Sequence, residues 1–435
     1  MFFSPQIGMA DSADFARIMT RLGLGRPFEN AHLNFFNFFN SNYPITGKLK
    51  FPLNPAQIFG SVAFFLNKWL YSEKLFSIYI LSAMYIILYI IGFHHFIRNL
   101  LGRVPNRPFR FLLLLISLLI FTDVMFISYF NSFYQESIFI ISGLYVIALL
   151  LQNEVRHHLL LLAFFFLFLS KGQNLIFIVF PIFIIVRRWK SLNKYYLTSG
   201  ILITAFVLFF QLKTQVQTNE ANLYESVFLG LLYQADETEQ KSILKQMGLN
   251  NPHYLDNVGK VYWRPGNELY DYNLNKEFYQ KVKNGTILKM YFYHPDLFLK
   301  TGMAGLKMIY NESAQPDHLG NLSLQNSIDG QKTIVKSVYG KYLNKLIIPG
   351  YFVIFLFYIC RSILFRLERA EWIAWALLIF IPLVFVANFV AGGINDFIKH
   401  NLSVYFMFSV LLVLFFLSFF KTFKVNYSLN NFKIK

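Results

Sequence analysis

The sequence predicts an all-α polytopic membrane protein with about nine transmembrane helices and a mostly helical extracytoplasmic domain. Hydrophobic residues make up 55% of the 435-residue chain, which contains 52 phenylalanines, and charged residues make up only 14%. A soluble domain of this size could not bury so many aromatic side chains. Apolar runs near the length that spans about 30 Å of hydrocarbon recur along the chain, so we expect an integral membrane protein.

An excess of basic residues accompanies the apolar runs. The formal net charge of +17 would indicate a nucleic-acid partner in a soluble protein. Here the basic residues lie in short loops between apolar runs, as the positive-inside rule predicts, so we expect no nucleic acid among the partners. The single cysteine, Cys360, permits no disulfide within the chain.

Residues 1–75 are predicted to be a first extracytoplasmic segment with amphipathic interfacial helices. Ser12 is a suitable cap for a helix that runs to about Leu22, with Gly23 and Gly25 as the stop. Apolar side chains at i, i+3, i+4 and i+7 form one stripe, which we expect to rest on the outer leaflet. The stripe consists of Phe15, Ile18, Met19 and Leu22. A second amphipathic stretch is predicted at roughly 55–71.

Residues 76–212 are predicted to form a transmembrane core. Its apolar runs are 76–97, 111–130, 137–151, 159–169, 175–186 and 196–212. The runs 159–169 and 175–186 are too short to cross alone at about 1.5 Å per residue. They are interpreted either as thin or tilted helices or as one re-entrant pair.

Residues 213–345 are predicted to form an extracytoplasmic domain, because this segment is polar, mixed in charge and too long for a loop. Helical stretches are expected near 223–247 and 286–311. Residues 346–420 are predicted to be C-terminal transmembrane helices, with spans at 346–365, 372–391 and 403–420. Residues 421–435 form a predicted cytoplasmic tail.

The distribution of positive charge predicts which loops are cytoplasmic. One alternate set of loops carries Arg98, Arg103, Arg107, Arg110, Arg156, Arg187, Arg188, Lys190, Lys194, Arg361, Arg366 and Arg369, and the tail carries Lys421, Lys424, Lys433 and Lys435. The other short loops carry only Lys171 and Lys399. The first set is therefore placed in the cytoplasm. Because residue 1 then lies outside, we expect a further transmembrane helix before it.

The first external segment contains the leading catalytic candidates. Asp11 and Asp14 are three residues apart and can project toward one point on a helix, with Arg17 and Arg21 on a neighbouring polar stripe. An Asp at a helix start also satisfies free backbone N–H groups, so a purely structural role stays open for Asp11.

Asp123 lies inside an otherwise apolar run. An ionised carboxylate there costs about 2.5–3.5 kcal/mol unless it faces a cavity or a partner, so we treat it as a candidate substrate-binding residue. The alternative is a protonated or helix-paired structural Asp. The external turn that follows contains Tyr134 and Glu136, which either point into a site or, for Glu136, cap the next helix.

Two further external loops contribute candidate substrate-binding residues. Lys171 and Gln173 follow a short apolar run, where a lone lysine suits an anionic phosphate or reaches the lipid headgroups. The last external loop combines an acid, a base and a potential proton carrier in Asp396, Lys399 and His400.

The sequence contains no Walker loop, nucleotide-binding glycine fingerprint or zinc-ligand spacing. We therefore expect an activated substrate to arrive through the membrane, attached to a lipid. No cofactor is required. Asp11 and Asp14 could hold a divalent metal, but nothing in the pattern requires one.

The motifs resemble those of the polytopic GT-C glycosyltransferases. The run Asp11 to Phe15 matches an Asp-x-x-Asp-Phe start, Asn131 to Glu136 an Asn-Ser-Phe-Tyr-x-Glu turn, and Ser170 to Gln173 a Ser-Lys-x-Gln motif. Together with the late Asp-x-x-x-His loop, Asp396 to His400, they are most similar to the bacterial glycan-biosynthesis hexose transferases associated with surface-layer glycans.

The resemblance implies a polyprenyl-phosphate-linked hexose as donor and an extracytoplasmic glycan or lipid-linked acceptor. It places the general base on Asp11 or Asp14 and the donor phosphate near Arg17, Arg21 and Lys171. Such an enzyme would lie in a bacterial cytoplasmic membrane with an extracytoplasmic active site. Two other functions stay open: a transporter or lipid flippase, in which Asp123 and Glu136 form a relay, and a surface-polysaccharide polymerase or ligase.

Overall fold

A computed structural model describes residues 8–9, 11, 15–26, 40–52, 54–104, 106–154, 156–170, 198, 200, 205, 216–262, 272–311, 337–394 and 397–432. The chain divides into two compact units. Unit 1 comprises Met1–Phe209, Ser313–Phe380 and Tyr405–Lys435, and unit 2 comprises Phe210–Glu312 and Ile381–Val404. Each unit is described by itself.

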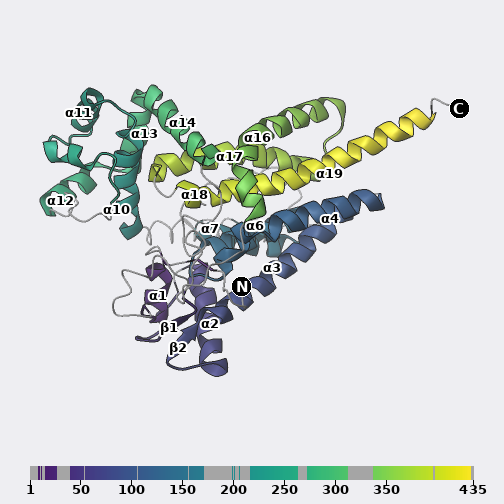
Figure 1. Cartoon of the computed structure of the whole chain (residues 1–435), viewed down its shortest axis with the longest axis horizontal. Coiled ribbons are helices and arrows are strands. Elements are labelled where there is room, and N and C mark those ends of the chain that lie inside the picture. The colour runs from purple at the N-terminus through teal and green to yellow at the C-terminus, as the bar shows by residue number, and fades with distance from the viewer. Residues whose placement is uncertain are drawn as a thin grey trace. The chain divides into compact units, whose positions relative to one another are not determined.

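The N-terminal part of unit 1 combines two helices with a small sheet. Its elements are α1 (Ala16–Leu22), β1 (Asn42–Pro44), α2 (Pro55–Leu70) and β2 (Leu75–Ser77) (Figure 1). The strands are antiparallel, with Tyr43 opposite Phe76. Helix α2 begins where the Asn54 side chain accepts the Gln57 N–H at 2.9 Å, and Pro55 fills the first helical position.

The structure corrects two predictions about α1, namely where it begins and where its apolar stripe lies. It begins at Ala16, and Ser12 lies outside the described residues; the predicted stop at Gly23 is confirmed by a left-handed φ of 67°. The apolar stripe does not rest on the outer leaflet, because all four of its side chains are buried in the protein. A Cβ placed on Gly60 of α2 would meet the side chains of Leu22 and Ile18, so the stripe packs on α2.

The predicted second amphipathic stretch is confirmed as α2, which does carry an exposed apolar stripe. The side chains are spaced at i, i+4, i+7 and i+11, as one face of a helix requires. They are Ile58, Val62, Phe65 and Trp69, with exposure rising to 81% at Trp69. We infer that α2, rather than α1, presents an apolar face outward.

The helical core of unit 1 follows in sequence order. It consists of α3 (Ile78–Leu101), α4 (Arg107–Phe121), α5 (Val124–Ile127), the 3₁₀ turn η2 (Ser128–Phe130), α6 (Glu136–Leu150) and α7 (His157–Ser170). Helix α6 packs between α3 and α7. A Cβ on Gly92 of α3 would lie 2.8 Å from the Tyr145 ring, so α3 and α6 approach closely.

The predicted span 111–130 is not one continuous helix. Helix α4 ends at Phe121, and the chain bends by 44° before α5 and η2. Asp123 is the N-cap of α5, because its side chain accepts the Met125 N–H at 2.8 Å. An N-cap residue adopts a non-helical backbone, which is why the helix is broken at this position.

The C-terminal helices are α16 (Val338–Leu364), α17 (Arg369–Gly392), α18 (Phe397–His400) and α19 (Leu402–Phe432). Within the described residues, α3, α16, α17 and the part of α19 over Leu402–Thr422 are long and apolar enough to cross a membrane. Helix α4 and the bent segment Val124–Phe130 that follows it make a fifth candidate if they count as one span. Helices α6 and α7 are apolar but shorter.

The helical fold is therefore confirmed, with helices that could cross a membrane, and nine spans stay a prediction. The predicted spans 175–186 and 196–212 lie outside the described residues, except for Thr198, Gly200 and Ala205.

Unit 2 contains α10 (Val216–Glu225), the π-helical η4 (Ser226–Leu231), α11 (Glu237–Gln246), the 3₁₀ helix η5 (Pro252–Asn257), α12 (Tyr272–Lys281), α13 (Asn284–Tyr293) and α14 (Pro295–Asn311). These helices enclose a core that includes Tyr224, Phe228 and Phe278. Helices are thus present at both predicted stretches, although each stretch is interrupted. The compact unit ends at Glu312 rather than 345 and also takes in the segment Ile381–Val404.

Candidate functional site

In unit 1, residues near the start of the chain contact the turn between η2 and α6. The Met9 N–H donates to the Asn131 carbonyl at 3.3 Å. The Phe15 ring lies edge-on to Tyr134, with centroids 4.9 Å apart. We call Asp11, Arg26, Tyr43 and Tyr134 the Asp11 cluster, because these four polar side chains gather at this junction.

Asp11 makes a hydrogen bond and an ion pair with neighbouring residues. Only 3% of the residue is exposed. Oδ1 accepts the Phe15 N–H and Oδ2 accepts the Arg26 Nε–H, both at 3.3 Å. These distances are just beyond the usual range of 2.7–3.2 Å, so neither bond is strong. The first contact is the helix-start role that the sequence left open for Asp11, and the second is an ion pair.

Arg26 was missed by sequence reasoning, and the backbone explains its position. After α1 ends at Gly23, the Gly25 N–H donates to the Pro44 carbonyl at 2.8 Å, so the chain runs beside β1. A Cβ on Gly23 would lie 2.6 Å from the Gly47 backbone, so only glycine permits this approach. The turn brings Arg26 back toward Asp11 while 40% of its side chain stays exposed.

Aromatic rings form the wall behind the carboxylate. Phe133 packs against Phe15 at 5.4 Å and against Tyr43 at 5.1 Å between centroids. Burial raises the pKa of the Tyr43 hydroxyl well above 10.0, and the nearby charge of Asp11 raises it further, whereas Arg26 lowers it. The Tyr43 hydroxyl is therefore protonated at neutral pH and can act as a hydrogen-bond donor.

The other predicted residues of this region lie beside the cluster. Glu136, a buried side chain, opens the first turn of α6 two residues after Tyr134. Arg17 and Arg21 are on α1, where their backbone carbonyls accept hydrogen bonds from Gln57 Nε2 at 2.9 Å and the Lys50 N–H at 2.8 Å. The ion pair described above joins Asp11 to the guanidinium of Arg26.

Asp123 has a structural explanation. Besides capping α5, its Oδ2 accepts the Tyr339 N–H at 2.8 Å, and its Oδ1 accepts the Ser337 hydroxyl. Ser337 Oγ in turn accepts the Gly340 N–H at 2.7 Å as the cap of α16. The carboxylate joins two helix starts, which is the helix-paired alternative considered for this residue.

Four predicted site residues, Asp14, Lys171, Gln173 and Asp396, lie outside the described residues. Lys399 and His400 form the end of α18 in unit 2. The Lys399 side chain is buried, and the His400 carbonyl accepts a hydrogen bond from Asn388 Nδ2 at 2.8 Å. Their convergence with Asp11 on one cavity stays a prediction.

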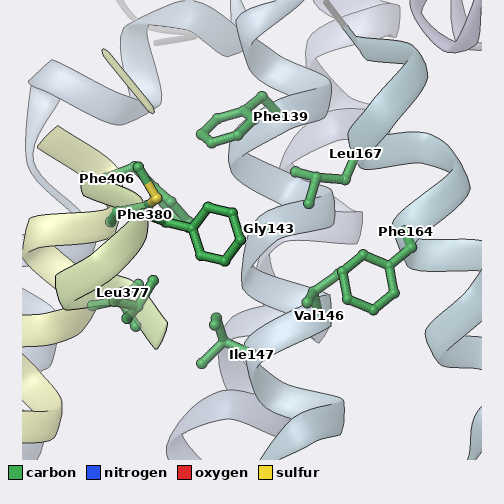
Figure 2. Close-up of a pocket in the computed structure, with 11 residues that line it drawn as sticks. Phe139, Gly143, Val146, Ile147, Phe164, Leu167, Leu377, Phe380 and Phe406 are labelled. Atoms are coloured by element: carbon green, nitrogen blue, oxygen red, sulfur yellow. The ribbon is translucent and has the colours of Figure 1, made fainter. Parts of the chain in front are cut away.

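A small cavity of about 50 Å³ lies among α6, α7, α17 and α19 in unit 1. Figure 2 shows Phe139, Gly143 and Phe406 around it, and all its lining residues are apolar. With no polar group to bind or move a proton, this cavity belongs to the packing of the helices. No cluster of three or more His, Cys, Asp or Glu side chains suited to a metal occurs within the described residues.

Comparison with known proteins gives one family. The model of the YfdI N-terminal transmembrane domain matches residues 1–434. No curated protein and no solved structure matches the chain significantly. The match agrees with the long apolar helices. The chain is an integral membrane protein and belongs to the YfdI N-terminal transmembrane domain family.

Proposed function

We propose that the protein is a membrane glycosyltransferase that moves a hexose from a polyprenyl-phosphate-linked donor to an extracytoplasmic glycan or lipid-linked acceptor. One observation carries the proposal: the buried Asp11 carboxylate is paired with the partly exposed Arg26 guanidinium at the junction with Tyr134. A carboxylate and a cation side by side, in a chain with membrane spans, are the groups that transfer from a lipid phosphate requires.

The reaction assigns a role to each group. The acceptor oxygen attacks C1 of the hexose, the bond from C1 to the phosphate oxygen breaks, and the anomeric centre inverts. The acceptor proton passes to a carboxylate, and the lipid phosphate leaves as an anion. Arg26 suits the leaving phosphate, because a guanidinium binds phosphate oxygens through several fixed N–H donors. Stabilising this developing charge is expected to be a large part of catalysis.

Asp11 is the first candidate base, because the reaction needs a carboxylate as proton acceptor and Asp11 lies beside the cation assigned to the phosphate. Its contacts with Phe15 and Arg26 are both 3.3 Å long, and catalytic hydrogen bonds are often long until substrate is bound. Asp14 is the second candidate base, three residues further along the chain.

The transporter alternative depended on Asp123 and Glu136 as a relay. Because the Asp123 carboxylate joins the starts of α5 and α16, it is poorly suited to carry protons. Transfer is therefore the function that the geometry supports better.

Transfer can be tested with the full chain in liposomes. Undecaprenyl-phosphate glucose, galactose and mannose would be supplied as donors, and release of undecaprenyl phosphate would be measured with a membrane extract as acceptor. We expect D11N or D14N, whichever removes the base, to lower the rate by about 10²–10⁴-fold. R26Q should weaken donor binding, and K48Q, which removes an exposed cation of the same N-terminal region that is assigned no role, serves as its control.

Two outcomes would count against the proposal. Full activity of both D11N and D14N would remove the carboxylate base, and equal losses in R26Q and K48Q would remove the phosphate role of Arg26. Because no cofactor is expected, activity should survive EDTA, and loss of activity that Mg²⁺ restores would show a metal requirement.

A further inference from the structure

A second and larger cavity in unit 1 runs along α6. It measures about 280 Å³ and is lined by side chains of α2, α3, α6 and α7. Phe59, Ile138 and Phe166 line one end, and most of the remaining wall is aliphatic. This volume is close to the lower end of the range for small-molecule sites, about 300–1,000 Å³. We call this cavity the α6 groove.

The groove has a polar end opposite Ile138, while Ser142 and Tyr145 line it near the middle of α6. His95 from α3 and Gln152 and Arg156 from the connection between α6 and α7 line the polar end. Arg156 is exposed, and no hydrogen bond or ion pair of its guanidinium is found within the described residues. No acidic side chain lines the groove, although the exposed Glu154 lies two residues before Arg156.

An apolar trough with a cationic end fits one class of ligand, a lipid with an anionic headgroup. The chain would lie along the aliphatic wall of α6 and the phosphate would lie at Arg156, because a guanidinium matches phosphate geometry. By the predicted sidedness, Arg156 faces the cytoplasmic leaflet, whose anionic lipids attract basic residues.

The groove is distinct from a donor site at the Asp11 cluster. Tyr134 of that cluster lies one turn before Ile138, whereas Arg156 lies beyond the other end of α6. The 15 residues of α6 span about 22 Å. A donor with its phosphate near Arg26 would leave Arg156 for a second headgroup. We propose that the α6 groove binds an anionic phospholipid of the cytoplasmic leaflet, with its phosphate at Arg156, independently of sugar transfer.

Lipid binding to the full chain tests the proposal. Delipidated protein in detergent would be titrated with phosphatidylglycerol and phosphatidylcholine of identical acyl chains, and bound lipid would be counted by native mass spectrometry. We expect one site that prefers phosphatidylglycerol by about five- to tenfold, and R156Q should reduce its affinity to that for phosphatidylcholine.

The controls distinguish a specific headgroup site at Arg156 from the general attraction of anionic lipid to exposed arginines. R366Q removes another exposed arginine of the predicted cytoplasmic loops that does not line the groove, and should keep the preference. A163F places a large ring in the wall of the groove and should weaken both lipids. Unchanged preference in R156Q, or equal losses in R156Q and R366Q, would overturn the proposal. So would displacement of phosphatidylglycerol by undecaprenyl phosphate, since the groove would then hold the donor.

Discussion

Removal of the Asp123 carboxylate should destabilise unit 1 by disconnecting two helix starts. The carboxylate accepts the Met125 N–H at the start of α5 and the Tyr339 N–H at the start of α16, both at 2.8 Å. It also accepts the Ser337 hydroxyl, which caps α16. Asp123 is buried, so water cannot fully replace these bonds when the carboxylate is removed.

The expected cost follows from the groups that lose a partner. Loss of the α5 cap in D123A costs about 0.5–2 kcal/mol, and leaving the buried Tyr339 N–H without an acceptor costs about 1–3 kcal/mol. D123A should therefore destabilise by roughly 2–5 kcal/mol. D123N keeps one carbonyl oxygen for the cap but turns an amide toward Tyr339, so its loss should be about half as large.

Reversible unfolding by SDS in bicelles, followed by tryptophan fluorescence, would measure these differences. S337A combined with D123A should show a coupling energy of about 0.5–3 kcal/mol, because the two side chains share one network. The control D256N alters an exposed carboxylate and should stay within about 0.5 kcal/mol of the native chain. A D123A variant as stable as D256N would refute this reasoning. A stable D123N that loses only transfer activity would return Asp123 to the substrate site.

Three further predictions concern other parts of the fold. G393A should destabilise unit 2 by more than about 1 kcal/mol, because φ is +62° and a Cβ would meet backbone atoms. G285A, where a Cβ in α13 would meet nothing, should instead stabilise unit 2 by about 0.5–1 kcal/mol, and hydrogen exchange would measure both changes. R361M should cost about 3–5 kcal/mol by stranding the buried Glu371 carboxylate, and the double variant R361M/E371M should recover most of it on SDS unfolding. The pKa of Glu277 is lowered, chiefly by a hydrogen bond from Lys281 one turn along the helix. The contribution of Glu277 to the free energy of unfolding is therefore present above pH 4.5 and is lost as the pH falls through the folded-state pKa. E277Q should reduce that loss by about 0.2–1 kcal/mol in unfolding measured as a function of pH.

Long apolar runs predicted the membrane helices well, because hydrophobicity over about 20 residues depends little on tertiary contacts. The predicted spans 76–97, 346–365, 372–391 and 403–420 all fall on described helices. The break at Asp123 could not be predicted in the same way, since the apolar run continues across it. The break depends instead on the two carboxylate oxygens of Asp123, which accept hydrogen bonds from the start of α16, a helix far along the chain.

The candidate site was predicted only in part, because it too depends on contacts between segments that are far apart in the sequence. The sequence selected Asp11 and the turn that contains Tyr134 as separate site candidates, and the structure brings the two segments together. The choice between Arg17, Arg21 and Arg26 depended on where the chain goes after Gly23. An arginine in an irregular segment has no periodicity to indicate its direction, and the pairing with Asp11 follows from the backbone contacts with β1.

The packing of α1 on α2 explains both why the α1 stripe was wrongly placed on the lipid surface and why Asp11 is buried. Because the apolar stripe turns inward, Asp11 is carried into the protein rather than to the lipid surface. A buried carboxylate needs a partner, and Arg26 supplies it. A guanidinium has five N–H donors, more than one carboxylate oxygen uses, and 40% of the Arg26 side chain reaches the surface. The burial of Asp11 thus holds Arg26 near the surface, and in the proposed reaction a cation held there would stabilise the leaving phosphate.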